Sequence, residues 1–118
     1  MPDNSPVSVV AAPTFQRHLR ALAKKYRSLR QDLAPLLAQL EQGETPGEQI
    51  PGVGYAVFKA RIKNSDVKKG KSGGYRLIYY LETSQIVVLL TIYPKSDQIN
   101  ITAPEIREII ARYEAQLD

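Results

Sequence analysis

Apolar residues near the start of the chain recur at alternating intervals of four and three, the spacing of one face of an α-helix. They are Phe15, Leu19, Leu22, Tyr26 and Leu29. Pro13 suits the first turn of this helix, and the β-branched run at 7–11 predicts an edge strand before it. Arginine and lysine occupy the other side of the helix, which we therefore expect to face water.

A second apolar series predicts another helix, which ends at Gly43. Its members are Leu33, Leu36, Leu37 and Leu40. Two starts are compatible with the residues before it. Ser28 and Gln31 fit a capping box. Pro35, however, is tolerated only in a first turn and favours a later start with Asp32 as the cap. Either start leaves a short link, so the two helices are predicted to form an antiparallel hairpin.

The apolar period changes to two after the glycine- and proline-rich loop 43–54, which indicates a β-strand at 55–63. The even-numbered positions of this strand are apolar and are expected to face the core. The odd-numbered positions face the other way and include Lys59, Arg61 and Lys63. The strand is therefore predicted to be half-buried, with a basic outer face.

Two further strands are predicted at 74–82 and 86–93, joined by a tight turn. In the first of them, Arg76 and Tyr80 fall on the same face because they are separated by an even number of positions. The second is apolar on both faces, as an interior strand is, and Pro94 ends it.

The last apolar series, within 106–117, predicts a helix that begins with a capping box between Thr102 and Glu105. The order strand, two helices, three strands, helix is typical of an α+β fold. We expect a small, mostly antiparallel sheet of about four strands, packed on one side by the N-terminal helical hairpin and the C-terminal helix. Residues 1–118 are expected to form one domain, with 1–6 disordered.

Composition narrows the classes of function. The chain has no cysteine, which excludes disulfides, thiolate nucleophiles and cysteine-bound zinc. No signal peptide is recognisable in 1–6. The longest apolar run, 86–90, is too short to span a bilayer. We therefore expect a cytoplasmic protein with no membrane partner.

The positive charge of the chain is concentrated in one stretch. The formal net charge is +4, but residues 59–76 hold seven lysines and arginines against a single acid, Asp66. The rest of the chain holds nine basic residues against eleven acids. Such a concentration is typical of a protein that binds a polyanion. A solvated, charged loop is the alternative interpretation.

Gly70, Lys71 and Ser72 resemble the end of a nucleotide-binding phosphate loop. That loop needs a glycine five residues earlier, where this chain has Ser65, and a helix directly after it. A strand is predicted after Ser72 instead. The sequence therefore argues against a nucleotide hydrolase.

The same basic residues suit a different phosphate, because a sheet face with lysine, arginine and tyrosine can hold a phosphodiester backbone and stack a base. The residues expected on this surface are Lys59, Arg61, Lys63, Arg76, Tyr80 and Lys95. His18, the only histidine, is expected on the surface of the first helix without a catalytic role. The carboxylates do not cluster, so neither a metal site nor another cofactor is expected.

RNA cleavage fits such a site because RNA carries its own nucleophile, the 2′-hydroxyl group. A lysine whose pKa is lowered by neighbouring positive charge can act as the general base. An arginine can stabilise the charge that develops on the phosphoryl oxygens. DNA lacks the 2′-hydroxyl group, so it would be bound but not cut by this route.

The chain resembles the RelE/ParE superfamily of toxins from bacterial type II toxin–antitoxin systems, and within it the RelE- and HigB-type members. The resemblance covers about 14–117 and rests on the order of the elements and on the segments KGKSGGYRLIYY and IVVLLTIYPKSD. It implies a ribosome-dependent mRNA endonuclease that inhibits translation, with a cognate antitoxin, the ribosome and mRNA as partners. ParE-type members inhibit DNA gyrase instead, and a non-catalytic RNA- or protein-binding module of the same fold is a third alternative.

The resemblance also implies roles for individual residues. Arg76 matches the family's arginine that contacts the scissile phosphate. Lys69, Lys71 and Lys95 match basic residues of the same site and are expected to contact phosphate or carry protons. Lys68, in the same cluster, is expected to bind substrate. Which lysine acts as the general base stays open.

The chain departs from RelE at two positions of that site. Ser96 stands where RelE has a second arginine, and Thr102 stands where RelE has a tyrosine that is proposed to stack on the substrate. We expect Tyr80 or Tyr93 to take the place of that tyrosine. The retained lysines and arginine favour an RNase over a gyrase inhibitor.

Overall fold

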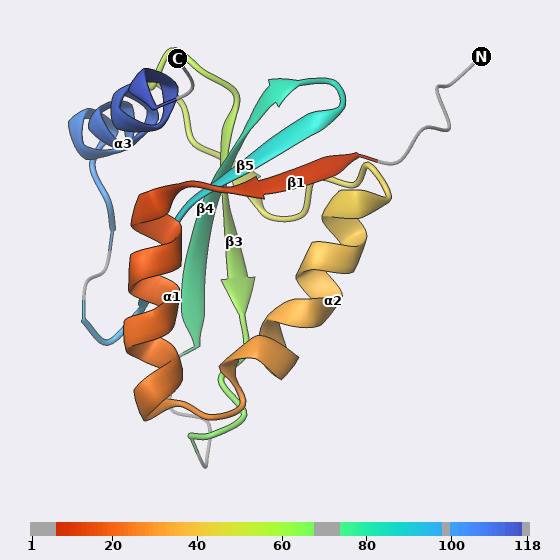
Figure 1. The fold of residues 1–118 in the computed structure, drawn as a ribbon, viewed down its shortest axis with the longest axis vertical. Helices are drawn as coiled ribbons and strands as arrows, with labels where there is room; N and C mark the ends of the chain where they lie inside the picture. The colour runs from red at the N-terminus through yellow and green to blue at the C-terminus, as the bar shows by residue number, and fades with distance from the viewer. Residues whose placement is uncertain (1–6, 68–73, 98–99, 117–118) are drawn as a thin grey trace.

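The computed structural model describes residues 7–67, 74–97 and 100–116, which contain one five-stranded sheet and three helices (Figure 1). The strands are β1 (Ser8–Ala11), β2 (Glu48–Gln49), β3 (Val57–Ile62), β4 (Tyr75–Thr83) and β5 (Ile86–Pro94), and the helices are α1 (Pro13–Lys25), α2 (Leu29–Glu41) and α3 (Ala103–Ala115). The order across the sheet is β1-β5-β4-β3-β2, with only the β1–β5 pair parallel.

The predicted α+β fold with a mostly antiparallel sheet is confirmed. The sheet has five strands rather than about four, because the two-residue strand β2 forms within the predicted loop 43–54 and pairs with β3. The expected disorder of residues 1–6 concerns a segment outside the described residues.

Strand β4 is the middle of the sheet and is buried on both faces. Every residue from Tyr75 to Tyr80 is at most 6% exposed. Alternation along the strand sends Leu77 and Tyr79 to one face and Ile78 and Tyr80 to the other. The fold therefore has two apolar layers, one on each side of this strand.

Helices α1 and α2 cover the first face and splay apart from their common link (Figure 1). Phe15 of α1 and Leu33 and Leu40 of α2 belong to the same cluster of buried side chains as Leu77 and Tyr79 of β4. This is the helical hairpin expected from the apolar spacing of 15–40, and its apolar stripe faces the sheet.

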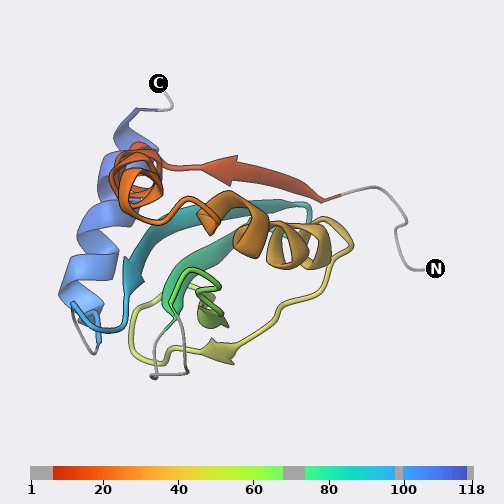
Figure 2. The same cartoon turned by 90° about the horizontal axis from the view of Figure 1, so that it is seen from below.

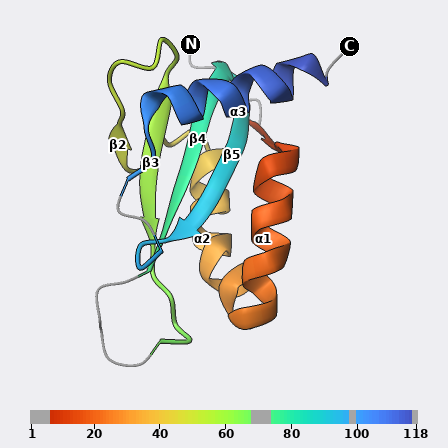
Figure 3. The ribbon, with the colours of Figure 1, turned by 90° about the vertical axis from the view of Figure 1, so that its left-hand side faces the viewer.

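Helix α3 covers the opposite face of the sheet. Ile106 and Ile110 pack in one cluster with Ile78 and Tyr80, and Figure 3 shows α3 in front of the strands with α2 behind them. The expectation that all helices lie on one side of the sheet is therefore wrong. The reason is that β4 and β5 are apolar on both faces, so both faces need a cover that removes them from water.

Helix α2 begins at Leu29, so the later start favoured by Pro35 is wrong. Ser28 is the N-terminal cap residue, but its side chain makes no capping hydrogen bond. Pro35 lies inside the helix on its exposed side, where the loss of one backbone hydrogen bond is tolerated. The helix therefore begins at the earlier of the two predicted starts, although Ser28 makes no capping bond there.

The loop after β3 supplies the partners that hold the start of α2. The Asp66 carboxylate accepts a hydrogen bond from the backbone N–H of Ser28 at 2.8 Å. In return, Asp32 of α2 accepts bonds from the backbone N–H and the hydroxyl of Ser65, at 2.9 and 2.8 Å. These reciprocal bonds, which we call the loop clamp, join segments more than thirty residues apart.

Helix α3 begins with the predicted capping box, in which the Thr102 hydroxyl accepts from the backbone N–H of Glu105 at 3.3 Å. Tyr75 begins a strand rather than a helix, which agrees with the rejection of a nucleotide-binding phosphate loop at 70–72. None of the helices in the described part of the chain is long and apolar enough to cross a membrane.

A substitution at Gly47 tests the tight approach of the β2 segment to β3. Gly47 has a φ of 95°, and a Cβ atom there would overlap the backbone of Lys59 and lie 2.9 Å from the Cα atom of Ala60. Gly52 has a φ of 81° but no atom within 4 Å of such a Cβ. We expect Gly47→Ala to lower the free energy of unfolding by roughly 3 kcal/mol, from overpacking added to the left-handed backbone.

Gly52→Ala is the matched control. It should lower the free energy of unfolding by only about 1–2 kcal/mol, the strain of a left-handed backbone at a residue with a Cβ atom. Urea unfolding of both variants measures the difference. Equal losses would show that the contact between the β2 segment and β3 relaxes freely.

Candidate functional site

Arg61, Arg76 and Tyr93 form a straight row across three neighbouring strands. Arg61 of β3 pairs with Arg76 of β4, and Arg76 pairs with Tyr93 of β5. Residues that pair in this way have adjacent side chains on one face of the sheet. Lys59 lies two positions before Arg61 and therefore on the same face. We call the surface formed by Lys59, Arg61 and Arg76 the basic face.

The guanidinium group of Arg76 lacks a counter-charge in the part of the chain that the structure describes. Arg76 is only 6% exposed, and its printed hydrogen bond runs from Nη1 to the carbonyl oxygen of Tyr75 at 3.2 Å. The one ion pair among the described residues, between Arg112 and Glu108, is elsewhere. Arginine is rarely buried without a partner, because desolvating a charge is costly. An anion at this position would therefore be stabilised.

Lys59 and the segment before α3 border the basic face. The Lys59 ammonium group donates a hydrogen bond to the side-chain oxygen of Asn100 at 3.3 Å. This bond places Asn100, which precedes α3, beside the basic face at β3.

Tyr93 closes the row at the β5 side. Its hydroxyl group is buried and has no hydrogen-bond partner among the described residues. Burial raises the pKa of Tyr93, while the charge of Arg76 lowers it and that of Glu105 raises it. Tyr93 pairs with Arg76 across the two strands, so the two side chains are neighbours on this face. A polar group that stays buried without a partner costs about 1–3 kcal/mol, which a ligand that hydrogen-bonds to it recovers.

Lys63 and Lys95 lie where the strands of the basic face end. Lys63 is exposed directly after β3, and Lys95 is half-buried directly after β5. The backbone N–H of Lys95 donates to the carbonyl oxygen of Gly74 at 3.1 Å, which ties it to the start of β4. Both lysines are therefore at the same end of the sheet as Arg76.

Three further lysines that sequence reasoning assigned to the site, Lys68, Lys69 and Lys71, lie outside the described residues. The described chain stops at Val67 and resumes at Gly74, directly before β4. Their roles stay predictions.

Tyr80 shares its face with Arg76 but belongs to the core. It is 2% exposed and packs in the cluster that α3 covers. Its ring meets that of Tyr55 edge to face, with the ring centroids 5.8 Å apart. Burial raises the pKa of its hydroxyl group. Of the two tyrosines expected to contact substrate, Tyr93 is therefore the one that lies beside Arg76.

His18 is not a free surface residue, contrary to the expectation from its place on a charged helix. It is half-buried, and its Nδ1 atom is 2.7 Å from the Thr91 hydroxyl oxygen. Burial, followed by the charge of Arg17, lowers the pKa of His18. Histidine and threonine are 73 positions apart, so no local sequence signal indicates this pair.

The described residues contain no group of three histidine, aspartate or glutamate side chains placed to hold a metal ion. The cations that the structure places at this site can bind phosphate and stabilise developing negative charge, and lysine can transfer protons.

Comparison with protein families matches residues 14–116 to the model described as the RelE toxin of the RelE/RelB toxin–antitoxin system. The match covers both helices of the hairpin, the strands of the basic face and α3. It confirms the resemblance drawn from the sequence.

The lowered pKa of His18 predicts a pH-dependent stability. The unfolded histidine has a pKa of about 6.5 and binds a proton before the folded one does as the pH falls. The contribution of neutral His18 is therefore present above that pH and is lost below it. His18→Gln keeps a hydrogen-bonding group toward Thr91 but does not titrate.

Urea unfolding at about pH 7.5 and about pH 5 should thus show a larger loss of stability for the wild type than for His18→Gln. Arg17 and the charged residues of α3 are unchanged in the variant, so their titration cancels in the comparison. Equal losses of stability in the two proteins between these pH values would contradict a lowered pKa of His18.

Proposed function

Since the chain belongs to the RelE toxin family, we propose that this toxin of a toxin–antitoxin system is an endoribonuclease that cuts mRNA on the ribosome and thereby stops translation. Membership implies a cognate antitoxin as its protein partner. The ribosome and mRNA are the further partners of the proposal, and the cytoplasm is the compartment where they meet.

The observation that carries the proposal is the row of Arg61 and Arg76 with no carboxylate paired to either among the described residues. Two arginines that are neighbours across a strand pair repel each other and gain from an anion that binds both. A phosphodiester group has the charge and the oxygen geometry for this position. Lys59 and Lys95 extend the positive surface along the path of an RNA strand.

Cleavage requires no group beyond the RNA and these side chains. The 2′-oxygen attacks the adjacent phosphorus while a general base takes its proton. The bond from phosphorus to the 5′-oxygen breaks, and a general acid gives that oxygen a proton. The products are a 2′,3′-cyclic phosphate and a 5′-hydroxyl group. No metal-bound step is needed.

In this reaction Arg76 stabilises the negative charge that builds up on the phosphoryl oxygens. Lysine is the available proton carrier, and the candidates are Lys69, Lys71 and Lys95, with Lys59 and Arg61 as contacts to the neighbouring backbone.

Replacement of Arg76 tests the proposal. Induced expression of the wild type should arrest translation, and Arg76→Ala should relieve the arrest because it removes the charge nearest the reacting phosphate. On purified ribosomes with bound mRNA, we expect the cleavage rate to fall by about 10²–10³-fold. Arg20→Ala removes an equal charge from the exposed side of α1 and should cleave like the wild type.

Product analysis separates this function from its alternatives. Cleaved mRNA should carry 2′,3′-cyclic phosphate ends. Full toxicity of a folded Arg76→Ala protein would show that the site is elsewhere. Intact mRNA together with defects in DNA supercoiling would instead identify a gyrase inhibitor.

A further inference from the structure

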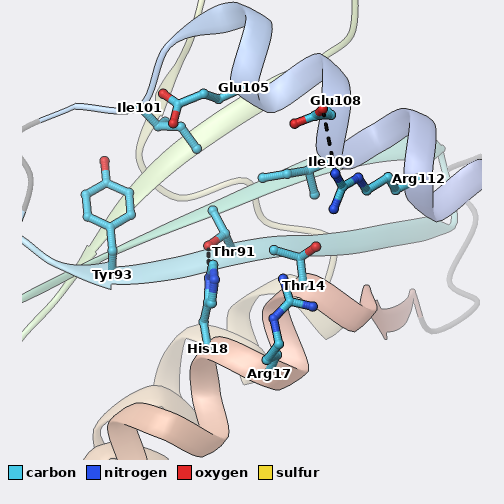
Figure 4. Close-up of a pocket in the computed structure, with 10 residues that line it drawn as sticks. All are labelled: Thr14, Arg17, His18, Thr91, Tyr93, Ile101, Glu105, Glu108, Ile109 and Arg112. Carbon is cyan, nitrogen blue, oxygen red and sulfur yellow. Dashed lines mark hydrogen bonds and ion pairs between the residues drawn. The ribbon is translucent and has the colours of Figure 1, made fainter.

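A pocket of about 230 Å³ lies between α1 and α3, beside β5 (Figure 4). Figure 2 shows these two helices close together at one end of the sheet. The pocket is lined by Thr14, Arg17, His18, Thr91, Tyr93, Ile101, Glu105, Glu108, Ile109 and Arg112. Thr91 and Tyr93 are 3% and 6% exposed and form its floor, while the charged residues of both helices are exposed at its rim.

The pocket shares Tyr93 with the row of the basic face. Tyr93 pairs with Arg76, and Thr91 pairs with Ile78, so both pocket residues lie on the same face of the sheet as Arg76. One side chain therefore separates the pocket from the guanidinium group of Arg76. Arg76 and the pocket are therefore neighbours on this face of the sheet.

The lining combines apolar walls with groups that accept and groups that donate hydrogen bonds. Ile101 and Ile109 are half-buried apolar residues, and Glu108 forms an ion pair with Arg112 at 3.7 Å. Arg17 has no ion pair among the described residues. This mixture suits a flat, uncharged ring with polar edges better than it suits a phosphate, which the glutamates would repel.

The size of the pocket also favours a single flat ring as its ligand. Sites for drug-sized ligands occupy about 300–1,000 Å³, so this pocket is too small for a whole nucleotide cofactor. RNA is read mainly through single unstacked bases, which rest on aromatic rings and form hydrogen bonds through their edges. Tyr93 offers the aromatic ring and the rim offers the hydrogen-bonding groups.

We propose that this pocket receives the base of the RNA nucleotide next to the phosphate held by Arg76, and that His18 and Arg17 set a preference among bases there. The proposal rests on the proposed function in so far as RNA is the ligand. His18 is positioned by its bond to Thr91 and contacts the base edge, and Arg17 donates from the rim.

The carboxylates of Glu105 and Glu108 determine which bases the pocket should prefer. A carboxylate accepts hydrogen bonds from an exocyclic amino group, as in its pairing with cytosine. Uracil has no amino group. Bases with an amino group should therefore bind better than uracil at this position.

Binding of two short RNAs to the full-length protein tests the pocket without any cleavage. The probes are tetranucleotides that differ only in carrying cytosine or uracil at one position. In amide and imidazole NMR spectra, the cytosine probe should shift the signals of His18 and Thr91 more than the uracil probe does. The dissociation constant for the cytosine probe should be lower by about tenfold, or about 1.4 kcal/mol.

Arg17→Ala and His18→Gln should each weaken binding of the cytosine probe about tenfold and reduce the difference between the probes. Arg20→Ala, one turn further along α1, should bind both probes like the wild type. Arg17 is exposed, so its replacement is expected to leave the fold intact.

The outcomes distinguish failure of the pocket proposal from failure of the proposed nuclease function. If neither RNA shifts the signals of His18 and Thr91, the pocket proposal is overturned, whether or not ribosome-bound mRNA is cut. Equal affinity of the wild type for the two probes would overturn the base preference. Pocket shifts in a protein that leaves ribosome-bound mRNA intact would support the pocket and count against the nuclease.

Discussion

The burial of β4 on both faces is the constraint on which the rest of the structure depends. A strand that is apolar on both sides needs a cover on each, and the helical hairpin can supply only one. The chain must therefore cross the sheet after β5 to place α3 on the other face. Helix α3 packs over Tyr80, and Arg76 lies four positions earlier on the same face of the strand, where its side chain is only 6% exposed.

Arg76 is thus an arginine placed in a strand that otherwise carries apolar and aromatic side chains. The protein bears the desolvation of this cation and leaves the Tyr93 hydroxyl group beside it without a partner among the described residues. Both features cost stability in the free protein, and a bound phosphate would offset both. Strain of this kind is usual where a fold holds a binding site ready before the ligand arrives.

Alternation along 55–63 and 74–82 was enough to predict from the sequence alone which side chains share a face. It placed Lys59, Arg61 and Arg76 together, as the strand register confirms. Periodicity does not say which face a later helix covers, so the position of α3 was predicted wrongly. Local signals offered two starts for α2, and Pro35 favoured the wrong one; the observed start at Ser28 is held by Asp66 across the loop clamp. The pairing of His18 with Thr91 had no signal at all, since it depends on how α1 packs beside β5.

The loop clamp has an electrostatic consequence as well as a structural one. Asp66 is the single acid among the residues of 59–76, and its carboxylate is turned toward the start of α2, where it also acts on Tyr75 on the helical-hairpin side of the sheet. At physiological salt a charge is felt over only about 8 Å. A polyanion that approaches the basic face would therefore meet cations whose one acidic neighbour in 59–76 is engaged at the start of α2. Under the proposed function, the orientation of this one carboxylate would contribute to the rate at which the protein captures RNA.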